Sequence, residues 1–247
     1  MDRVMEIAAA EGAIDAHMFT PDGADKALPP VVMFTDIGGL RPSYYEKAQK
    51  VAEGGYAVLL PNIYYRDVTG QAVPDSRSYR ERAMLSTLRS YGRRLTPDAL
   101  AGDFEALLRC IDAEPEFADG GIGVVGYCMT GGFALRMAAN HSRRVVAAAG
   151  FHSARLAVED DPASPLHVVD SIEAQVYLGH ADRDELMPPD QIARLDGALA
   201  EAGVHFTTEL YRGAGHGYST SDAPAHDEVA EARHYKRLFT LLKETID

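Results

Sequence analysis

Short apolar runs alternate with amphipathic stretches along most of the chain. A run that is apolar throughout is typical of a strand buried on both faces, and such strands need helices on both sides of a parallel sheet. Apolar residues at helical spacing fill the stretches between the runs. We therefore predict an α/β fold with a mostly parallel central sheet. The expected strands are 31–35, 56–60, 122–126, 145–149, 175–178 and 206–211, and the expected helices are 44–52, 97–111, 131–139, 191–201 and 228–242.

Two further segments do not follow this alternation. Residues 4–8 and 13–19 read as one or two extra edge strands. The stretch 62–94 is polar, contains Gly70 and Pro74, and is expected to be a surface excursion that caps a pocket. Because 247 residues fit one large α/β domain and no linker or repeat interrupts them, we expect a single domain over 1–247.

The charge balance limits the possible partners. Lys and Arg number 24 against 37 Asp and Glu, which gives a net charge of -13. That charge repels phosphate backbones and anionic lipid surfaces, so we expect no nucleic-acid or membrane partner. No apolar run is long enough to span a membrane, and the first residues do not read as a signal peptide. The two cysteines, Cys110 and Cys128, form no disulfide framework, so we expect a cytoplasmic protein.

A glycine-rich turn between an expected strand and an expected helix carries one of these cysteines. Residues 126–132 read Gly-Tyr-Cys-Met-Thr-Gly-Gly. A nucleophile on such a strand-to-helix turn needs small residues on either side, because the two backbones crowd it. The helix N-terminus also favours a thiolate over a thiol. Cys128 is therefore a candidate nucleophile, and the alternative is a buried cysteine in a glycine-rich turn.

The glycines before this turn match a dinucleotide-binding pattern only superficially. Residues 121–126 read Gly-Ile-Gly-Val-Val-Gly. In a dinucleotide site the three glycines follow a strand and open a helix, and an acidic residue follows about 20 residues later. Here the glycines precede and span the strand, and that acidic residue is absent. The nucleophile interpretation is therefore favoured over a nucleotide-binding oxidoreductase.

A cysteine nucleophile needs a base, and a base needs an orienting acid. Residues 211–218 read Tyr-Arg-Gly-Ala-Gly-His-Gly-Tyr, which puts His216 in a glycine-rich loop after the last expected strand. The loop after the preceding strand carries two aspartates. Counting from Gly179 selects Asp182, whereas counting back from Pro188 selects Asp184, and we favour Asp184. The order nucleophile, acid, histidine is that of α/β-hydrolases.

Three more positions are candidates for the pocket. Residues 35–39 read Thr-Asp-Ile-Gly-Gly, and in α/β-hydrolases a turn at this place supplies one N–H of the oxyanion hole. The expected donors are therefore the N–H groups of Ile37 and of Met129. Asp36 is expected either beside the cysteine or as an Asx-turn residue. Substrate-binding or cysteine-modulating side chains, besides Asp36, are expected at Tyr127 and His152.

Together these motifs resemble the dienelactone hydrolase family. The matching pieces span most of the chain in the order of the family, and they are 36–39, 55–58 with 61–64, 126–129, Asp184 with Pro188, and 213–217. The resemblance implies an α/β-hydrolase fold with a triad of Cys128, His216 and Asp184. It also implies no metal and no organic cofactor. The implied reaction is hydrolysis of a small-molecule ester or enol-lactone through a cysteine thioester.

The chain departs from the family pattern at three places. The family usually has glutamate where Asp36 stands, and glycine where Thr130 stands. It also has an arginine shortly after the histidine to hold a substrate carboxylate, whereas residues 218–221 read Tyr-Ser-Thr-Ser. The substrate then either lacks that carboxylate or meets another arginine such as Arg155. The alternatives are a non-catalytic ligand-binding module and a thioester or amide hydrolase on the same triad. Either a monomer or a small homo-oligomer is expected.

Overall fold

The computed structural model describes residues 1–74 and 81–246. These form two compact units, Met1–Asp119 and Gly120–Asp247, each taken by itself below. The part of the expected surface excursion that falls on residues 75–80 lies outside the described residues.

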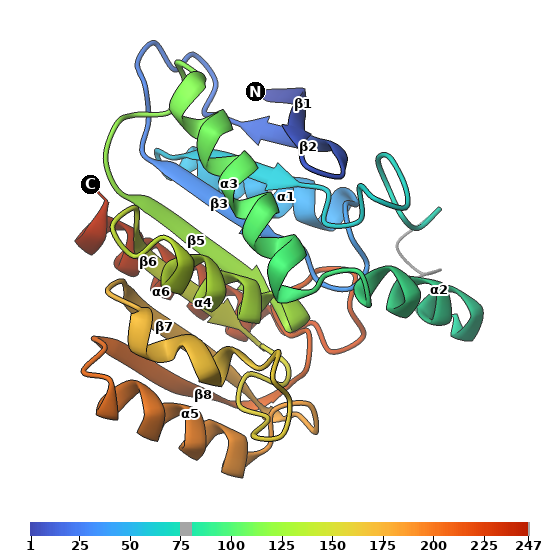
Figure 1. Cartoon of the computed structure of the whole chain (residues 1–247), viewed down its shortest axis with the longest axis vertical. Coiled ribbons are helices and arrows are strands. Elements are labelled where there is room, and N and C mark those ends of the chain that lie inside the picture. Colours follow the sequence, from blue (N-terminus) through green and yellow to red (C-terminus); the bar gives the residue numbers. More distant parts are fainter. Residues whose placement is uncertain (75–80, 247) are drawn as a thin grey trace. The chain divides into compact units, whose positions relative to one another are not determined.

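The strands described in the first unit lie in the order β1-β2-β4-β3 (Figure 1). Strands β1 (Asp2–Ala9) and β2 (Gly12–Phe19) form an antiparallel hairpin, which confirms the extra strands predicted near the start of the sequence. Strand β2 is also antiparallel to β4 (Ala57–Pro61), and β4 is parallel to β3 (Pro30–Phe34). All residues of β3 and β4 are buried, as expected for apolar strands covered on both faces.

Three helices belong to the described part of the first unit. Helix α1 (Pro42–Glu53) packs against β4, and α3 (Pro97–Ala113) packs against β1. As predicted, α3 begins at a proline after Thr96, whose hydroxyl accepts a hydrogen bond from the N–H of Ala99. Helix α2 (Arg82–Gly92) lies inside the stretch expected to be a surface excursion. Its apolar residues Met84, Leu85, Leu88 and Tyr91 recur at helical spacing, although only Leu88 is buried.

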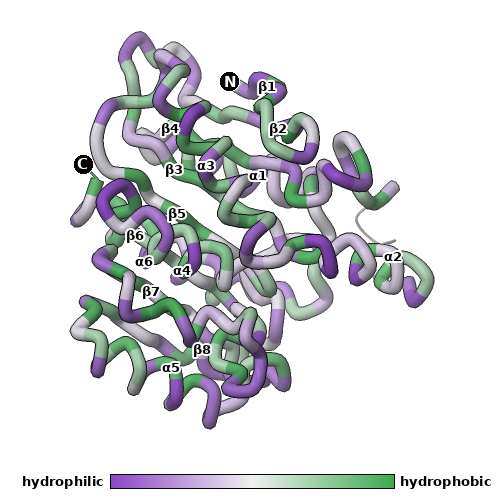
Figure 2. Tube along the Cα trace, viewed as in Figure 1, coloured by the Kyte–Doolittle hydropathy of each residue, from purple (hydrophilic) through white to green (hydrophobic). Residues whose placement is uncertain are grey.

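The strands described in the second unit are all parallel and lie in the order β5-β6-β7-β8. They are β5 (Ile122–Tyr127), β6 (Val145–Phe151), β7 (Gln175–Arg183) and β8 (Phe206–Gly215). Strand β5 is buried throughout and is largely hydrophobic in Figure 2. The glycine pattern 121–126 therefore lies at and within a strand, not at the start of a helix.

Three helices complete the described part of this unit: α4 (Gly131–Asn140), α5 (Pro189–Glu201) and α6 (Glu228–Thr245). Helix α4 is almost wholly buried, whereas α5 buries only Leu195 and Leu199 and alternates between polar and apolar residues in Figure 2. Asp227 begins α6 by accepting hydrogen bonds from the N–H groups of Val229 and Ala230. None of the described helices is long and apolar enough to cross a membrane.

Strand β7 is longer than the sequence predicts. We expected the strand to end at Leu178 and the acid loop to follow, but the strand continues through Arg183. Its last residues pair with β8, as Ala181 with Tyr211 and, after a register shift, Arg183 with Gly215. Since the four strands are parallel, their carboxyl ends meet at one edge of this sheet. The residues that follow β5, β6, β7 and β8 include Cys128, His152, Asp184 and His216.

Candidate active site

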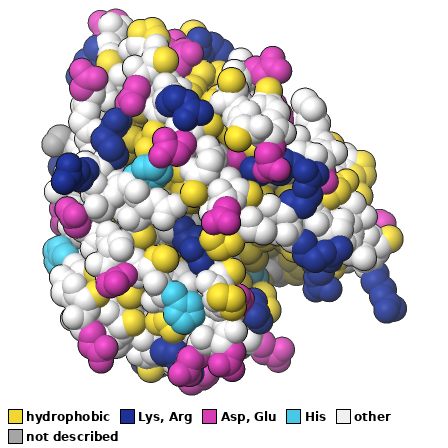
Figure 3. All heavy atoms as spheres, in the orientation of Figure 1, with side chains coloured by type: hydrophobic (Ala, Val, Ile, Leu, Met, Phe, Trp, Pro, Cys, Tyr) yellow, Lys and Arg dark blue, Asp and Glu magenta, His cyan; other side chains and the backbone are white. Residues whose placement is uncertain are grey.

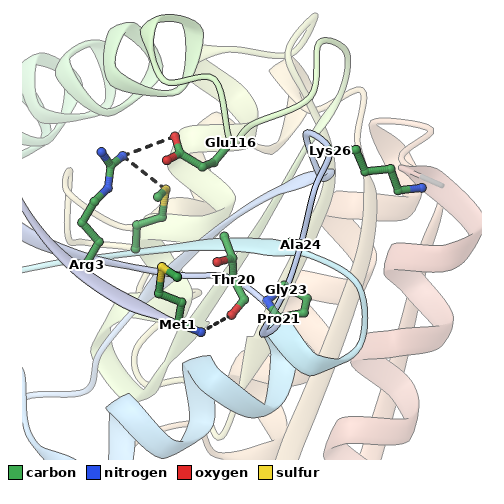
Figure 4. Close-up of a pocket in the computed structure, with 9 residues that line it drawn as sticks. Met1, Arg3, Thr20, Pro21, Gly23, Ala24, Lys26 and Glu116 are labelled. Atoms are coloured by element: carbon green, nitrogen blue, oxygen red, sulfur yellow. Dashed lines mark hydrogen bonds and ion pairs between the residues drawn. The ribbon is translucent and has the colours of Figure 1, made fainter.

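A cavity of about 180 Å³ in the first unit carries no nucleophile paired with a base. Figure 4 shows Arg3 directed toward Glu116, with Nη2 3.4 Å from Glu116 Oε2. The same Nη2 lies 3.8 Å from Met18 Sδ. On the face seen in Figure 3, acidic and basic side chains are interspersed rather than gathered into one patch. The cavity is lined by Met1, Arg3, Met18, Thr20, Pro21, Gly23, Ala24, Lys26 and Glu116.

Cys128 lies on the sharp turn between β5 and α4. It is partly exposed, and its backbone has a φ of 57°, which L-residues adopt only at a cost. The short 3-10 helix η2 (Cys128–Thr130) leads from it into α4 and contains Met129. A side chain at Gly126 would lie 2.0 Å from the carbonyl oxygen of Thr130, so this turn requires glycine there. The backbone is that of a nucleophile elbow.

Thr130 stabilises this turn where the family usually has glycine. Its Oγ1 donates to the carbonyl oxygen of Tyr127 and accepts from the N–H of Tyr127, both at 2.9 Å. Gly131 and Gly132 then supply the close approach: a Cβ at Gly131 would lie 2.0 Å from the Oγ of Ser153. The departure at Thr130 therefore moves the need for a small residue one position along the chain.

His216 follows β8 directly and contacts both Cys128 and Asp184. Its Nε2 lies 3.0 Å from Cys128 Sγ, and its Nδ1 lies 2.7 Å from Asp184 Oδ2. The side chain of Asp184 is only 1% exposed, and its Oδ1 accepts a hydrogen bond from the N–H of Leu186 at 2.9 Å. Three residues that the sequence separates widely thus form one hydrogen-bonded chain of thiol, imidazole and carboxylate.

Of the two aspartates left open by the sequence, Asp184 is the one that contacts His216. Asp182 instead accepts a hydrogen bond from the N–H of Gly213 at 2.8 Å, so it ties β7 to the histidine loop. Its neighbour Arg183 donates to the carbonyl oxygen of the same glycine.

The surroundings of His216 favour its charged form. Burial alone would lower the pKa of His216, but the hydrogen bonds and charges of Asp184 and Cys128 outweigh burial and raise that pKa to about 10. His180 on β7 shows the opposite case. Burial lowers its pKa to about 4, against the opposing charge of Asp184, so this second imidazole is neutral at neutral pH. The charged form is therefore favoured at His216, the imidazole that contacts Cys128, and not at His180.

The remaining candidates in the second unit lie around this chain of contacts. His152 is fully buried, and its Nε2 lies 2.9 Å from the Oγ of Ser219. Tyr127 is also fully buried, its ring stacks on Phe151, and its hydroxyl lies 2.9 Å from Nε2 of His234. These contacts give Tyr127 a place in the apolar interior, and its contact with a substrate stays a prediction.

The candidates in the first unit form a tightly bonded turn. Asp36 binds the guanidinium of Arg41 through both carboxylate oxygens, at 2.6 and 2.8 Å, and accepts from the N–H of Gly38 at 2.8 Å. The hydroxyl of Tyr64 donates to the carbonyl oxygen of Ile37 at 2.9 Å. Asp36 thus makes the Asx-type contact weighed as one alternative, whereas its place beside the cysteine stays a prediction.

Arg41 is the residue that sequence reasoning missed. It is fully buried and lies 4.8 Å above the ring of Tyr44. The available signal was an arginine five residues after an aspartate, directly before the proline that begins α1. Within the described ranges 1–74 and 81–246, no group of three or more His, Cys, Asp or Glu side chains is placed to hold a metal ion.

Comparison with known proteins places this chain in a family. The model of the dienelactone hydrolase family matches residues 14–246. The carboxymethylenebutenolidase of Rhodococcus opacus is 30% identical over 208 residues, which cover 82% of this chain and 75% of that protein.

Solved structures show the same fold. A dienelactone hydrolase-like promiscuous phosphotriesterase from metagenomic libraries superposes with a TM-score of 0.81 at 20% identity, covering 100% of this chain and 99% of that one. The dienelactone hydrolase of Anabaena variabilis gives a TM-score of 0.73 at 16% identity, with 100% and 99% covered. At these identities the likeness shows the α/β-hydrolase fold. The chain belongs to the dienelactone hydrolase family and is a hydrolase of lactones or esters.

Proposed function

We propose that the chain cleaves an ester or enol-lactone through a thioester on Cys128, with His216 as base and Asp184 as the orienting acid. One observation carries the proposal: His216 lies within hydrogen-bond distance of Cys128 Sγ through Nε2 and of Asp184 Oδ2 through Nδ1, at 3.0 and 2.7 Å. A nucleophile, a base and an acid in this order act as a unit in acyl transfer.

His216 takes the thiol proton of Cys128 on Nε2 before acylation, so the pair enters the reaction as a thiolate and an imidazolium. Asp184 holds the proton on Nδ1 and stabilises the imidazolium, consistent with the pKa of His216 at about 10. The thiolate attacks the acyl carbon and forms a C–S bond, while the carbonyl electrons move to the oxygen. When the carbonyl reforms, the acyl C–O bond breaks. The leaving oxygen, an enolate or phenolate, takes the proton from His216, which leaves the imidazole neutral.

Two backbone N–H groups would stabilise the oxyanion in this step. Met129 follows the proposed nucleophile in the 3-10 turn η2, directly before α4. Backbone N–H groups at the start of a helix have no partner within the helix, so they can bind an oxyanion. The N–H of Ile37 is the second proposed donor, on the turn held by Asp36, Arg41 and Tyr64. Each donor would contribute about 2.7–4 kcal/mol to transition-state stabilisation, by analogy with other oxyanion holes.

Hydrolysis of the thioester completes the cycle. His216 removes a proton from water, and the resulting hydroxide attacks the thioester carbon. The C–S bond then breaks, the acid product leaves, and the proton on His216 returns to Cys128. Because a thiolate is itself a good leaving group, this route favours acyl groups carried on enols and phenols.

The substrate carboxylate is the open part of the proposal. Ser219 and Thr220, near the position where the family has its arginine, are fully buried. Arg155 is the alternative cation. The side chain of Arg155 is 61% exposed. The backbone N–H of Arg155 donates to the carbonyl oxygen of Leu186, two residues after Asp184, at 2.8 Å. We infer either a substrate without a carboxylate or one held by Arg155.

The test is hydrolysis of an activated aryl ester and of a dienelactone by the wild type, Cys128→Ala and Cys110→Ala. Turnover by the wild type and by Cys110→Ala, absent in folded Cys128→Ala, is the expected result. A mass increase on the peptide containing Cys128 during turnover would identify the thioester. Full activity of Cys128→Ala would overturn the mechanism. The ratio of the two substrates, compared with that of Arg155→Gln, tells whether a carboxylate is recognised there.

A further inference from the structure

The segment after β6 is hydrogen-bonded to the loops that carry the nucleophile and the acid. The N–H of Ala154 donates to the carbonyl oxygen of Cys128 at 3.0 Å. The N–H of Arg155 donates to the carbonyl oxygen of Leu186, two residues after Asp184, at 2.8 Å. One short segment therefore fixes the backbone on both sides of the triad.

This segment also holds strained backbone. His152 has a φ of 38° and Arg155 a φ of 56°. Such conformations cost of order 1–3 kcal/mol in a residue with a Cβ, and they persist only where the surroundings determine them. At His152 the N–H donates to the carbonyl oxygen of Gly179 at 2.8 Å, which holds the strained residue against β7. The imidazole of this strained residue contacts the third loop.

That third loop carries His216, and the ring of His152 contacts it in two ways. Nε2 of His152 lies 2.9 Å from the Oγ of Ser219, three residues after His216. The ring also packs edge to face on His216, with centroids 5.5 Å apart, and on Tyr218, with centroids 5.1 Å apart. Both His152 and Ser219 are fully buried.

The loop around His216 needs support from outside. His216 lies between two glycines, and Gly217 has a φ of 93°. Glycine gives the backbone the freedom to make this turn, but it also adds conformational freedom that the loop must lose. His216 must meanwhile keep Nε2 at 3.0 Å from Cys128 Sγ and Nδ1 at 2.7 Å from Asp184 Oδ2. A displacement of about 1 Å would break one of the two contacts and can cost about 100-fold in rate.

We propose that His152 is a positioning residue, which with Ser219 holds the imidazole of His216 in contact with both Cys128 and Asp184. The inference rests on the proposed function for its catalytic consequence. Its structural part concerns the thiol–imidazole pair and can be measured without turnover. His152 itself acts through His216 and transfers no proton to the substrate.

The test uses two substitutions that remove the contact in different ways. Ser219→Ala removes only the hydroxyl. His152→Asn keeps a residue type that tolerates positive φ, but its side chain is too short to reach Ser219. The matched control is Ser164→Ala, because Ser164 is also buried and its Oγ donates to the carbonyl oxygen of Leu156 at 3.0 Å. Each variant is compared by thermal unfolding, by kcat and KM on an aryl ester, and by the rate of Cys128 alkylation with iodoacetamide against pH.

We expect both test variants to lose about 10- to 100-fold in kcat with little change in KM, and their alkylation profiles to shift to higher pH. Ser164→Ala should lose stability only. The proposal is overturned if the test variants keep the kcat and the alkylation profile of the wild type, even if they are less stable. An unchanged alkylation profile with reduced kcat also overturns it, because the thiol–imidazole pair would then be intact. Failure of the proposed function would show differently, as ester turnover by Cys128→Ala.

Discussion

Replacing Asp184 with asparagine tests the acid of the proposed triad with little change in shape. Asp184 uses one oxygen for Nδ1 of His216, at 2.7 Å, and the other for the N–H of Leu186, at 2.9 Å. An amide has only one oxygen, and the N–H of Leu186 can only donate. The amide therefore turns its oxygen to Leu186 and its NH2 to His216. The imidazole must then accept at Nδ1 and carry its proton on Nε2, facing the thiol.

In that tautomer His216 cannot remove the proton from Cys128. We expect kcat of Asp184→Asn to fall about 10⁴-fold, which corresponds to about 5.5 kcal/mol of lost transition-state stabilisation. The matched control is Asp182→Asn, because Asp182 accepts a hydrogen bond from the N–H of Gly213 at 2.8 Å and an amide oxygen can accept it equally well. The assay is steady-state hydrolysis of an aryl ester, with near-UV circular dichroism to verify folding. Equal activity of the two variants, or a larger loss in Asp182→Asn, would refute the assignment of the acid.

Two further predictions concern stability. A Cβ at Gly131 would lie 2.0 Å from Ser153 Oγ and 2.6 Å from Ser153 Cβ, so Gly131→Ala should lose about 1–3 kcal/mol in urea unfolding. Adding Ser153→Gly should restore most of that loss and adding Ser153→Ala much less; equal rescue by both would contradict the packing. Because the pKa of His216 is raised from 6.5 to about 10, its stabilising contribution is complete below about pH 6.5 and disappears as the pH rises toward 10. The Tm of the wild type should therefore fall more steeply between pH 7 and 10 than that of His216→Gln, and parallel curves would contradict the raised pKa.

The sequence predicts the strands well where burial leaves no room for polar residues. Strand β5 is buried on both faces, so its apolar run carries the whole signal. The end of β7 escapes prediction, because pairing with β8 and not burial keeps Arg183 in the strand. Helix α2 carries Met84, Leu85, Leu88 and Tyr91 at helical spacing, so the sequence does hold a signal for it, but the polar residues around them led us to expect a surface excursion.

The residues of the candidate site divide in the same way. Cys128, Asp184 and His216 are visible because each lies in a short motif directly after a strand, and Asp182 lies in the same motif as Asp184, near the end of β7. The choice between Asp182 and Asp184 depends on the direction of their side chains. That direction is set by the extension of β7 through Arg183, which a single sequence does not predict. The contact of His152 with Ser219 joins residues 67 positions apart, and a single sequence holds no record of such a pair.

Backbone strain is concentrated around the candidate site and can be measured at Cys128. The described non-glycine residues with positive φ are Cys128, His152 and Arg155, and the N–H of Ala154 binds the carbonyl oxygen of Cys128. At a φ of 57° a residue with a Cβ loses about 1–2 kcal/mol that glycine does not. We therefore expect Cys128→Gly to be at least as stable as Cys128→Ala.

The other cysteine of the chain provides the control for this comparison. Cys110 lies within α3, where glycine is about 1 kcal/mol less favourable than alanine, so Cys110→Gly should be less stable than Cys110→Ala. Urea unfolding of the four variants gives the difference in unfolding free energy between glycine and alanine at each position. At Cys110 we expect glycine to be less stable than alanine, and at Cys128 we expect glycine to be more stable than alanine or equally stable. If Cys128→Gly lost as much relative to alanine as Cys110→Gly does, the nucleophile turn would hold no strain. The positive φ at Cys128 would then need no support from the segment after β6.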